Sequence, residues 1–281
     1  MKVIISPRKN FRTILVGKYL LLFILSVLSL FPIFWLIITS IKMEVDIFAR
    51  PPLLIFRPTI QHYVYVLKTG FFGSYFLNSL SVALFTTFFS IIIGGLGAYS
   101  LARFKFYGDK LMAFLILSFR MLPPVALVIP MYLLARKFGL ANTKLSLIIA
   151  YTAFNLPFVT WMLRSYLDNV PVEVEEASMI DGASRMSTLV RITLPLSLPG
   201  IFATAIFCFL LSWNEFIFAL SLTSSPKAQT LPVAVSGFIS ARGIAWGELS
   251  ASTFIMLLPA FLFGVFAQRY IIKGLIPGAI K

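Results

Sequence analysis

The sequence contains one cysteine, one histidine and only ten acidic residues among 281. A single cysteine, Cys208, can neither form a disulfide within the chain nor build a thiolate metal site. His62 stands alone in a polar stretch, where we expect it to be solvated or locally bonded. No G-x-x-x-x-G-K-[ST] segment is present, so the chain is not expected to hydrolyse ATP itself. These absences argue against an enzyme, and we expect no cofactor and no metal in this chain.

Apolar residues dominate what is present: 59% of the chain is hydrophobic and the mean hydropathy is +0.94. A helix needs about 20 apolar residues to cross a bilayer. Six segments meet this requirement: Leu20–Ile41, Phe76–Leu101, Leu111–Leu134, Leu145–Leu163, Leu198–Leu222 and Leu249–Ala267. The first segment is too long for a signal peptide and lacks a small-residue cleavage site, which favours a spanning anchor. We therefore predict an all-α polytopic membrane protein with six transmembrane helices.

Prolines and small residues inside the predicted spans indicate where helices break and where they pack closely. Prolines inside spans kink or break helices, and four are expected to do so: Pro123, Pro124, Pro130 and Pro157. The run from Gly94 to Ala98 could be mistaken for a nucleotide loop. It lies within an uncharged span, however, where a small residue at each end of a four-residue step favours close helix packing.

The formal net charge of +14 suggests nucleic-acid binding at first sight. The basic residues are instead spread over the ends of the apolar segments, where they set orientation and meet anionic lipid headgroups. Most of the 24 lysines and arginines fall on the side that carries both termini, including an N-terminal cluster and the Arg103–Lys110 stretch. We expect both termini in the cytoplasm, lipid as a partner, and no nucleic acid.

One polar segment, from Pro171 to Pro199, interrupts the apolar sequence. Its charges and irregular backbone cannot lie in lipid, so we place it in the cytoplasm. It reads as two short helices, the first with Asn169 as N-cap and an early proline. Asp181-Gly182 predicts a turn, and the second helix should begin near Ala183 and end before Pro195.

The first of these helices is predicted to be amphipathic. Val174, Ala177 and Ile180 recur at helical spacing and form an apolar face. The remaining face is acidic, with Glu173, Glu175 and Glu176 near the positive end of the helix dipole. Ala177 and Ser178 are small, which lets the backbone of another protein come close. The pattern is typical of a docking surface.

The same residues carry a resemblance to a known family. The run Glu176-Ala-Ser-Met-Ile-Asp-Gly-Ala183, with Ile192, Leu194, Pro195 and Pro199 after it, resembles the EAA loop of ABC importer permeases. Ser178 replaces the second alanine of that pattern and is still small. Four further stretches are similar to the maltose-type carbohydrate permeases: Leu140-Ala-Asn-Thr, Trp213-Asn-Glu, Thr230-Leu-Pro-Val, and Gln268-Arg-Tyr through Lys281.

The resemblance implies the permease subunit of an ATP-driven importer in a prokaryotic cell membrane. Its partners would be a second homologous permease in a heterodimer, a homodimeric ATPase that binds ATP and Mg, and an extracytoplasmic sugar-binding protein. The solute would be a mono-, di- or oligosaccharide, with an α-glucoside preferred. Coupling to the ATPase is assigned to Glu173, Glu175, Glu176, Ala177, Ser178, Ile180, Asp181 and Gly182. The implied organisation is a cytoplasmic segment 1–19, a permease domain 20–272 containing the loop 168–199, and a tail 273–281 that reaches between the ATPases.

Polar residues inside the spans are candidates for the translocation path. Arg120 and Glu215 are the formal charges placed well within predicted spans, and such charges normally face the bundle interior or a water-filled path. The same two residues could instead pair with each other or with a partner subunit. Interhelical hydrogen bonding is the default role of three asparagines, with solute contact as the alternative: Asn78, Asn155 and Asn214.

Three other functions stay open from the residues alone. An ABC permease for a polyol, a glycerol phosphate or an osmolyte would share the same loop. A secondary transporter would need no ATPase, and the acidic connector argues against it. A membrane enzyme is disfavoured by the lack of catalytic motifs.

Overall fold

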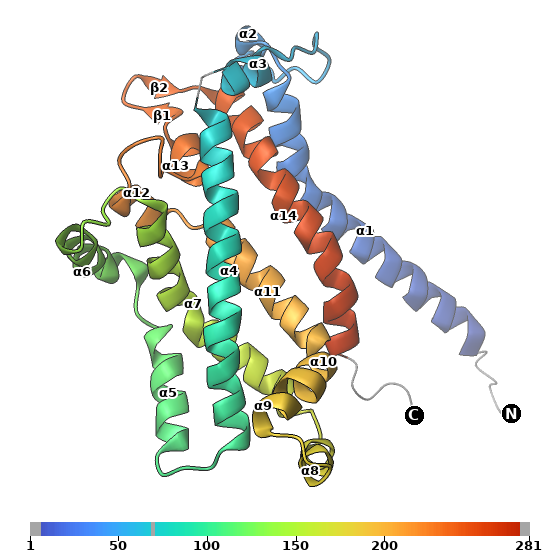
Figure 1. Cartoon of the computed structure of the whole chain (residues 1–281). Coiled ribbons are helices and arrows are strands. Elements are labelled where there is room, and N and C mark those ends of the chain that lie inside the picture. The colour runs from blue at the N-terminus through green and yellow to red at the C-terminus, as the bar shows by residue number, and fades with distance from the viewer. Residues whose placement is uncertain (1–6, 69–70, 276–281) are drawn as a thin grey trace, which may run out of the picture. The chain divides into compact units, whose positions relative to one another are not determined.

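The computed structural model describes residues 7–68 and 71–275 and is almost entirely helical (Figure 1). The all-α prediction is confirmed for these residues, apart from one short antiparallel ladder in which Ile239 pairs with Ile244. The chain divides into two compact units, Met1–Lys68 with Phe238–Phe254, and Thr69–Gly237 with Ile255–Lys281. The last of the three boundaries along the chain, between Phe254 and Ile255, falls within helix α14 (Trp246–Leu275).

The first unit is built around the N-terminal helix. Its elements are α1 (Pro7–Ser40), α2 (Glu44–Ile47), α3 (Gln61–Lys68), β1 (Ile239–Ser240), β2 (Gly243–Ile244) and the first turns of α14 (Trp246–Leu275). The histidine lies inside this unit and is only 8% exposed, so it is not solvated, and both ring nitrogens are bonded to groups of the same unit. Nε2 of His62 donates to the carbonyl of Lys42 at 2.8 Å, and Nδ1 lies 3.2 Å from Oε1 of Glu248. The imidazole thereby joins α3 to the start of α14.

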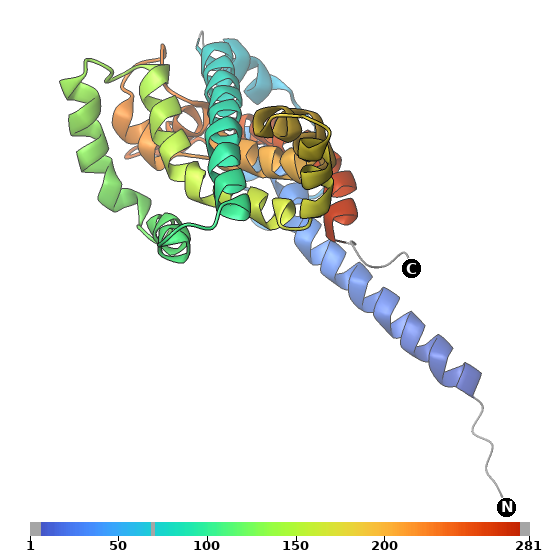
Figure 2. The ribbon, with the colours of Figure 1, turned by 60° about the horizontal axis from the view of Figure 1, so that its bottom comes forward.

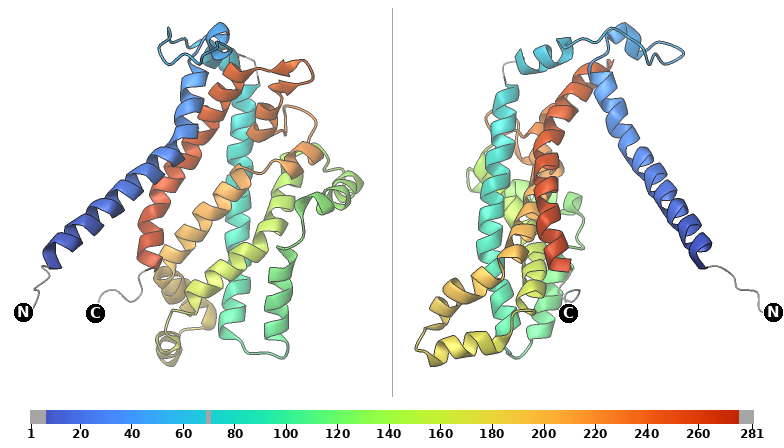
Figure 3. Two further views of the ribbon diagram at one scale, coloured as in Figure 1. Left: turned by 180° about the vertical axis from the view of Figure 1, so that it is seen from behind. Right: turned by 90° about the vertical axis from the view of Figure 1, so that its right-hand side faces the viewer.

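The second unit holds most of the chain. Its elements are α4 (Phe72–Arg103), α5 (Asp109–Phe119), α6 (Pro124–Lys137), α7 (Lys144–Leu167), α8 (Val172–Ile180), α9 (Arg185–Thr188), η1 (Leu189–Thr193), α10 (Leu194–Leu196), α11 (Leu198–Trp213), α12 (Ile217–Leu222), α13 (Leu231–Ser236) and the remainder of α14. The helix α4 runs the length of this unit with α7 and α11 packed beside it (Figure 3).

Four described helices are long and apolar enough to span a membrane: α1, α4, α7 and α14. Two bent pairs raise the number to six if each pair is one span. One pair is α5 with α6, bent by 91°, and the other joins Arg185–Leu196 to α11 at 77°. Figure 2 looks nearly along α5 and shows α6 turned away from it.

Two predicted spans are therefore not continuous helices. Leu111–Leu134 breaks at Pro123-Pro124, where the expected proline break occurs, because Pro124 starts α6 and the residue before it is held extended. Leu198–Leu222 is interrupted between Trp213 and Ile217. Pro130 and Pro157, in contrast, lie inside α6 and α7 without ending them.

The predicted termini fall partly outside the described residues. The segment 1–19 overlaps α1, which begins at Pro7, and residues 1–6 lie outside the description. Of the predicted tail 273–281, the first three residues continue α14 and 276–281 lie outside the description.

Close packing between α4 and α7 depends on the glycine-rich segment Gly94–Ala98 of α4. A Cβ atom on Gly94 would lie 2.8 Å from Cγ1 of Val159 and 3.3 Å from Oγ1 of Thr160. Ala98, four residues later, is fully buried on the same face. The packing interpretation of this run is confirmed, since a larger residue at Gly94 would have to displace the Val159 side chain of α7.

A matched pair of substitutions tests this contact. We expect Gly94→Ala to lower the thermal midpoint of the purified chain relative to Gly95→Ala, because overpacking costs about 1–3 kcal/mol. A Cβ at Gly95 would meet Leu163 at an ordinary 3.6 Å. Both changes gain the same helix propensity, so that term cancels in the comparison. Equal midpoints in detergent would show that Val159 moves aside without cost.

Candidate functional site

The polar connector begins with a well-defined entry into α8. The N-cap is Pro171, with φ −57° and ψ 129°, and not Asn169 as predicted. The amide of Asn169 instead donates to the carbonyl of Ser165 at 2.8 Å and so closes the end of α7. The prediction failed because an asparagine can satisfy the last turn of one helix as well as the first turn of the next.

The sequence does not indicate which side of α8 packs against the rest of the chain, and the structure decides it. Its buried residues are Glu175 and Ser178. Val174 is 41% and Ile180 is 86% exposed, and Ala177 is also exposed. The helix therefore presents apolar side chains outward and holds a carboxylate inside.

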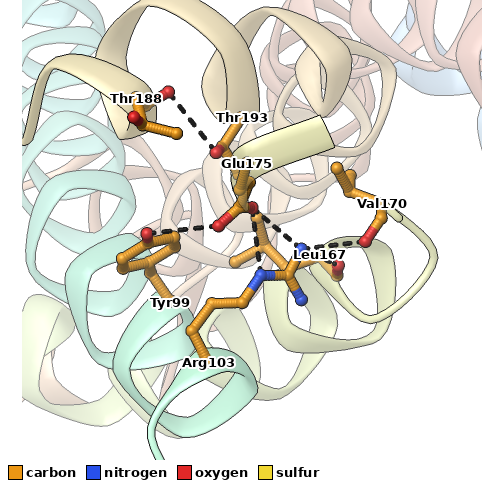
Figure 4. A network of polar contacts seen from close by, with 7 residues as sticks. All are labelled: Tyr99, Arg103, Leu167, Val170, Glu175, Thr188 and Thr193. Carbon is orange, nitrogen blue, oxygen red and sulfur yellow. Dashed lines mark hydrogen bonds and ion pairs between the residues drawn. The ribbon is translucent and has the colours of Figure 1, made fainter. Parts of the chain in front are cut away.

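Glu175 can be buried because its carboxylate is fully paired (Figure 4). Arg103, from the last turn of α4, places Nε 3.0 Å and Nη2 2.9 Å from Oε1 of Glu175. The hydroxyl of Tyr99, one turn earlier on α4, donates to Oε2 at 3.3 Å. Both charged side chains are below one-tenth exposed, at 7% for the arginine and 4% for the glutamate. A charge removed from water needs such partners.

Arg103 also reaches the end of α7. Its Nη2 donates to the carbonyls of Leu167 at 3.0 Å and Val170 at 2.9 Å. The last carbonyls of a helix lack intrahelical donors and carry partial negative charge, so a cation there is favourable. The guanidinium of Arg103 thus joins α4 both to α8 and to the end of α7.

The predicted turn after α8 is present. Gly182 has φ +93°, and its N–H donates to the carbonyl of Met179 at 3.1 Å. The N–H of Ala183 donates to the carbonyl of Ser178 at 3.1 Å, which completes a Schellman motif. Nothing lies within 4 Å of a Cβ built on this glycine, so its requirement is conformational and not steric within the chain.

The second helical piece differs from the prediction. Ser184 caps α9 by accepting from the N–H of Ser187 at 3.3 Å, and the chain continues through a π-helical turn into α10. It does not end before Pro195, because the π-helical turn Leu189–Thr193 continues directly into α10, and Pro195 lies inside this continuous helical stretch. The buried hydroxyls of Ser178 and Thr188 lie 3.1 Å apart and fasten α8 to α9.

Two of the residues proposed for the path have structural partners. The amide of Asn78 donates to the carbonyls of Pro226 and Gln229, both at 2.9 Å. The amide of Asn155 donates to Oγ of Ser212 at 3.0 Å and links α7 to α11. The amide of Asn214 is exposed and bonds back to its own helix at Leu210. Hydrogen bonding within the unit therefore accounts for Asn78 and Asn155.

The two charges that the sequence places within spans, Arg120 and Glu215, lie next to breaks between helices. Arg120 follows α5, donates to the carbonyl of Phe154 at 3.2 Å, and stands 4.7 Å from the centre of its ring. Glu215 lies between α11 and α12, and its carboxylate accepts from the N–H groups of Phe218 at 2.9 Å and Ala219 at 3.2 Å. The ion pairs among the described residues do not join Arg120 to Glu215.

Both charges nevertheless line one small cavity. Its volume is about 50 Å³, and its walls include Tyr151, Asn155 and Ser212. The Tyr151 hydroxyl is buried without a hydrogen-bond partner among the described residues. A cavity of this size holds water and not a sugar.

Two residues of the connector site were missed from the sequence. The sequence indicates only an orienting charge at Arg103, and nothing in it points to a role for Tyr99. A basic residue in the last turn of an apolar helix gives no indication that it bonds to a carboxylate 72 residues later. Among the described residues, no group of three or more His, Cys, Asp or Glu side chains could hold a metal ion.

The chain is similar to known proteins over most of its length. Residues 90–277 match the family described as binding-protein-dependent transport system inner membrane component. The trehalose/maltose transport system permease protein MalG of Thermococcus litoralis is 37% identical, over 92% of this chain and 94% of its own length. The inner membrane ABC transporter permease protein YcjP of Escherichia coli is 33% identical, over 95% of this chain and 96% of its own.

A solved structure shares the fold. A chain of a bacterial ABC transporter involved in the import of the acidic polysaccharide alginate superposes with a TM-score of 0.77 at 22% identity. The match covers 93% of this chain and 97% of that chain. The family resemblance seen in the sequence is confirmed by the family match and by the two relatives, and the solved structure adds the shared fold.

Proposed function

Because this chain belongs to the family of binding-protein-dependent transport system inner membrane components, we propose that it is the sugar-translocating permease subunit of an ATP-driven importer. It is a multi-pass membrane protein, and subunits of this family are translocation components and not catalysts. A sugar as solute is supported by the name of the relative at 37% identity. Within that class we favour an α-glucoside.

The outward face of α8 carries the proposed coupling function. In the isolated chain this helix exposes Val174, Ala177 and Ile180, which water does not favour. Glu173 and Glu176 are exposed on the same short helix and flank this apolar surface. A cleft of an ATPase subunit that covers the apolar side chains and pairs with the carboxylates would satisfy both. Glu175, in contrast, serves the chain's own packing.

The proposed partners follow from this assignment. A homodimeric ATPase binds ATP and Mg and hydrolyses the ATP, and one of its subunits receives α8. A second homologous permease completes the membrane path as a heterodimer. An extracytoplasmic sugar-binding protein delivers the solute. Both termini and the 168–199 loop face the cytoplasm, in a prokaryotic cell membrane. ATP-driven closure of the ATPases would move α8 and, with it, the spanning helices.

Fewer residues are proposed to line the translocation path than the sequence indicated. Arg120 and Glu215 keep their candidacy, because both border the small cavity at the two helix breaks. A break leaves backbone groups free to contact water or solute. Asn214 adjoins the same break on its exposed side, while Asn78 and Asn155 support the path by holding its helices together. At about 50 Å³ the cavity must widen before a sugar can pass.

Reconstitution tests the function. The chain would be purified from its native membrane in mild detergent, its partners identified, and ATP hydrolysis measured against a panel of sugars, polyols and glycerol phosphate. We expect a second permease and an ATPase to copurify, with hydrolysis stimulated by one sugar in the presence of its binding protein. Stimulation by a polyol or a phosphorylated solute would change the solute class. A chain that transports without any ATPase would establish a secondary transporter instead.

A further inference from the structure

The buried cluster that holds α8 has a role of its own. We propose that Arg103, Glu175 and Tyr99 form a rigid joint that transmits movement of α8 to the spanning helix α4. The three are positioning residues and not part of the ATPase contact. The inference rests on the proposed docking of α8, and it states how the movement continues beyond that helix.

The geometry of Glu175 separates it from docking. Glu175 is 3% exposed, and its side chain points into the chain toward Arg103 and Tyr99 (Figure 4). The neighbouring Glu173 and Glu176 are exposed and remain available to a partner. The buried carboxylate of Glu175 is therefore suited to attach α8 to the rest of the chain. The two exposed carboxylates are left to contact the ATPase.

The geometry of Arg103 makes the attachment rigid. Its guanidinium engages both Glu175 and the carbonyls of Leu167 and Val170 at 2.9–3.0 Å. A planar group held by several bonds in fixed directions cannot rotate as a lysine ammonium can. Displacement of α8 must therefore move the last turn of α4, or else leave two charges unpaired in a buried site.

The second fastening of α8 does not reach a long helix directly. The Ser178 hydroxyl meets Thr188 on α9, which is itself a four-residue helix within the connector. The Arg103–Glu175 pair, by comparison, ends on α4, whose 32 residues run through the second unit. Among the described residues it is also the ion pair with both side chains below one-tenth exposed.

The test compares Glu175→Gln and Arg103→Lys with wild type in the complete importer, reconstituted in proteoliposomes. The readouts are the amount of ATPase that copurifies, basal ATP hydrolysis, and solute imported per ATP hydrolysed. We expect normal copurification and basal hydrolysis, with the import-to-hydrolysis ratio lower by about fivefold or more. Tyr99→Phe removes one 3.3 Å bond and keeps the charge pair, so its loss should be smaller.

A surface pair provides the matched control. Arg164 and Asp168 also form an arginine–carboxylate pair beside this connector, at 3.8 Å and with 29% and 53% exposed side chains. Arg164→Lys and Asp168→Asn should leave the ratio within about twofold of wild type, because exposed pairs contribute little.

Three outcomes would contradict the proposed role of this joint, each in a different way. An unchanged ratio in Glu175→Gln would show that the pair carries no movement. A loss of ATPase from the purified complex of Glu175→Gln or Tyr99→Phe would show that the cluster governs docking or folding instead. If the wild-type chain itself binds no ATPase, the proposed function fails and not the joint alone.

Discussion

An Ile180→Glu permease is expected to fold like wild type and to lose solute-stimulated ATP hydrolysis by about tenfold or more. Ile180 is 86% exposed at the end of α8, so a glutamate there meets water in the isolated chain and costs no internal contact. In an ATPase cleft the same carboxylate would be desolvated. An unpaired buried charge is costly, and about 1.4 kcal/mol of lost binding free energy already gives tenfold weaker association.

The matched control is another exposed isoleucine. Ile55 is 94% exposed in the first unit, in the loop between α2 and α3. Ile55→Glu should retain stimulated hydrolysis, and both variants should keep the thermal midpoint of wild type in detergent. Copurification of the ATPase would be measured for each. Full stimulation in Ile180→Glu would mean that the apolar face of α8 does not contact the ATPase.

The connector shows both what a sequence can predict and where it stops. The turn at Asp181-Gly182 was predictable, because a positive φ strongly favours glycine. The inward face of α8 was not, because helical spacing tells which residues share a face and not which face is covered. That choice is made by Arg103, which lies 72 residues away along the chain.

The spans show the same division. Composition located six apolar segments, and Pro123-Pro124 correctly indicated a break between α5 and α6. The break around Glu215 had no such indication, since neither proline nor glycine occurs between Trp213 and Ile217. It is stabilised instead by the side chain of Glu215, which accepts from two N–H groups at the start of α12. Side-chain capping of this kind is decided by local competition for backbone donors.

The two helices that bracket the connector meet at a glycine. A Cβ on Gly200, in the first turn of α11, would overlap Cγ of Tyr166 in the last turn of α7 and would lie 2.7 Å from its Cβ and Cδ1. Neither ring carbon nor Cβ is the far end of a flexible chain, so α11 and α7 would have to separate. The connector from residue 168 to 199 joins the end of α7 to the start of α11, so a shift of these two helices would also shift the connector.

We therefore expect Gly200→Ala to lower the thermal midpoint of the chain and to reduce import, with an overpacking cost of about 1–3 kcal/mol. Gly264→Ala on α14 is the control, since nothing lies within 4 Å of a Cβ at that glycine. Tyr166→Gly removes all three contacting atoms, so the double variant should be more stable than the sum of the two single effects implies. Strict additivity in this cycle would show that the two helices do not touch through these residues. A favourable coupling with import restored would show that the contact between α7 and α11 sets the position from which α8 acts.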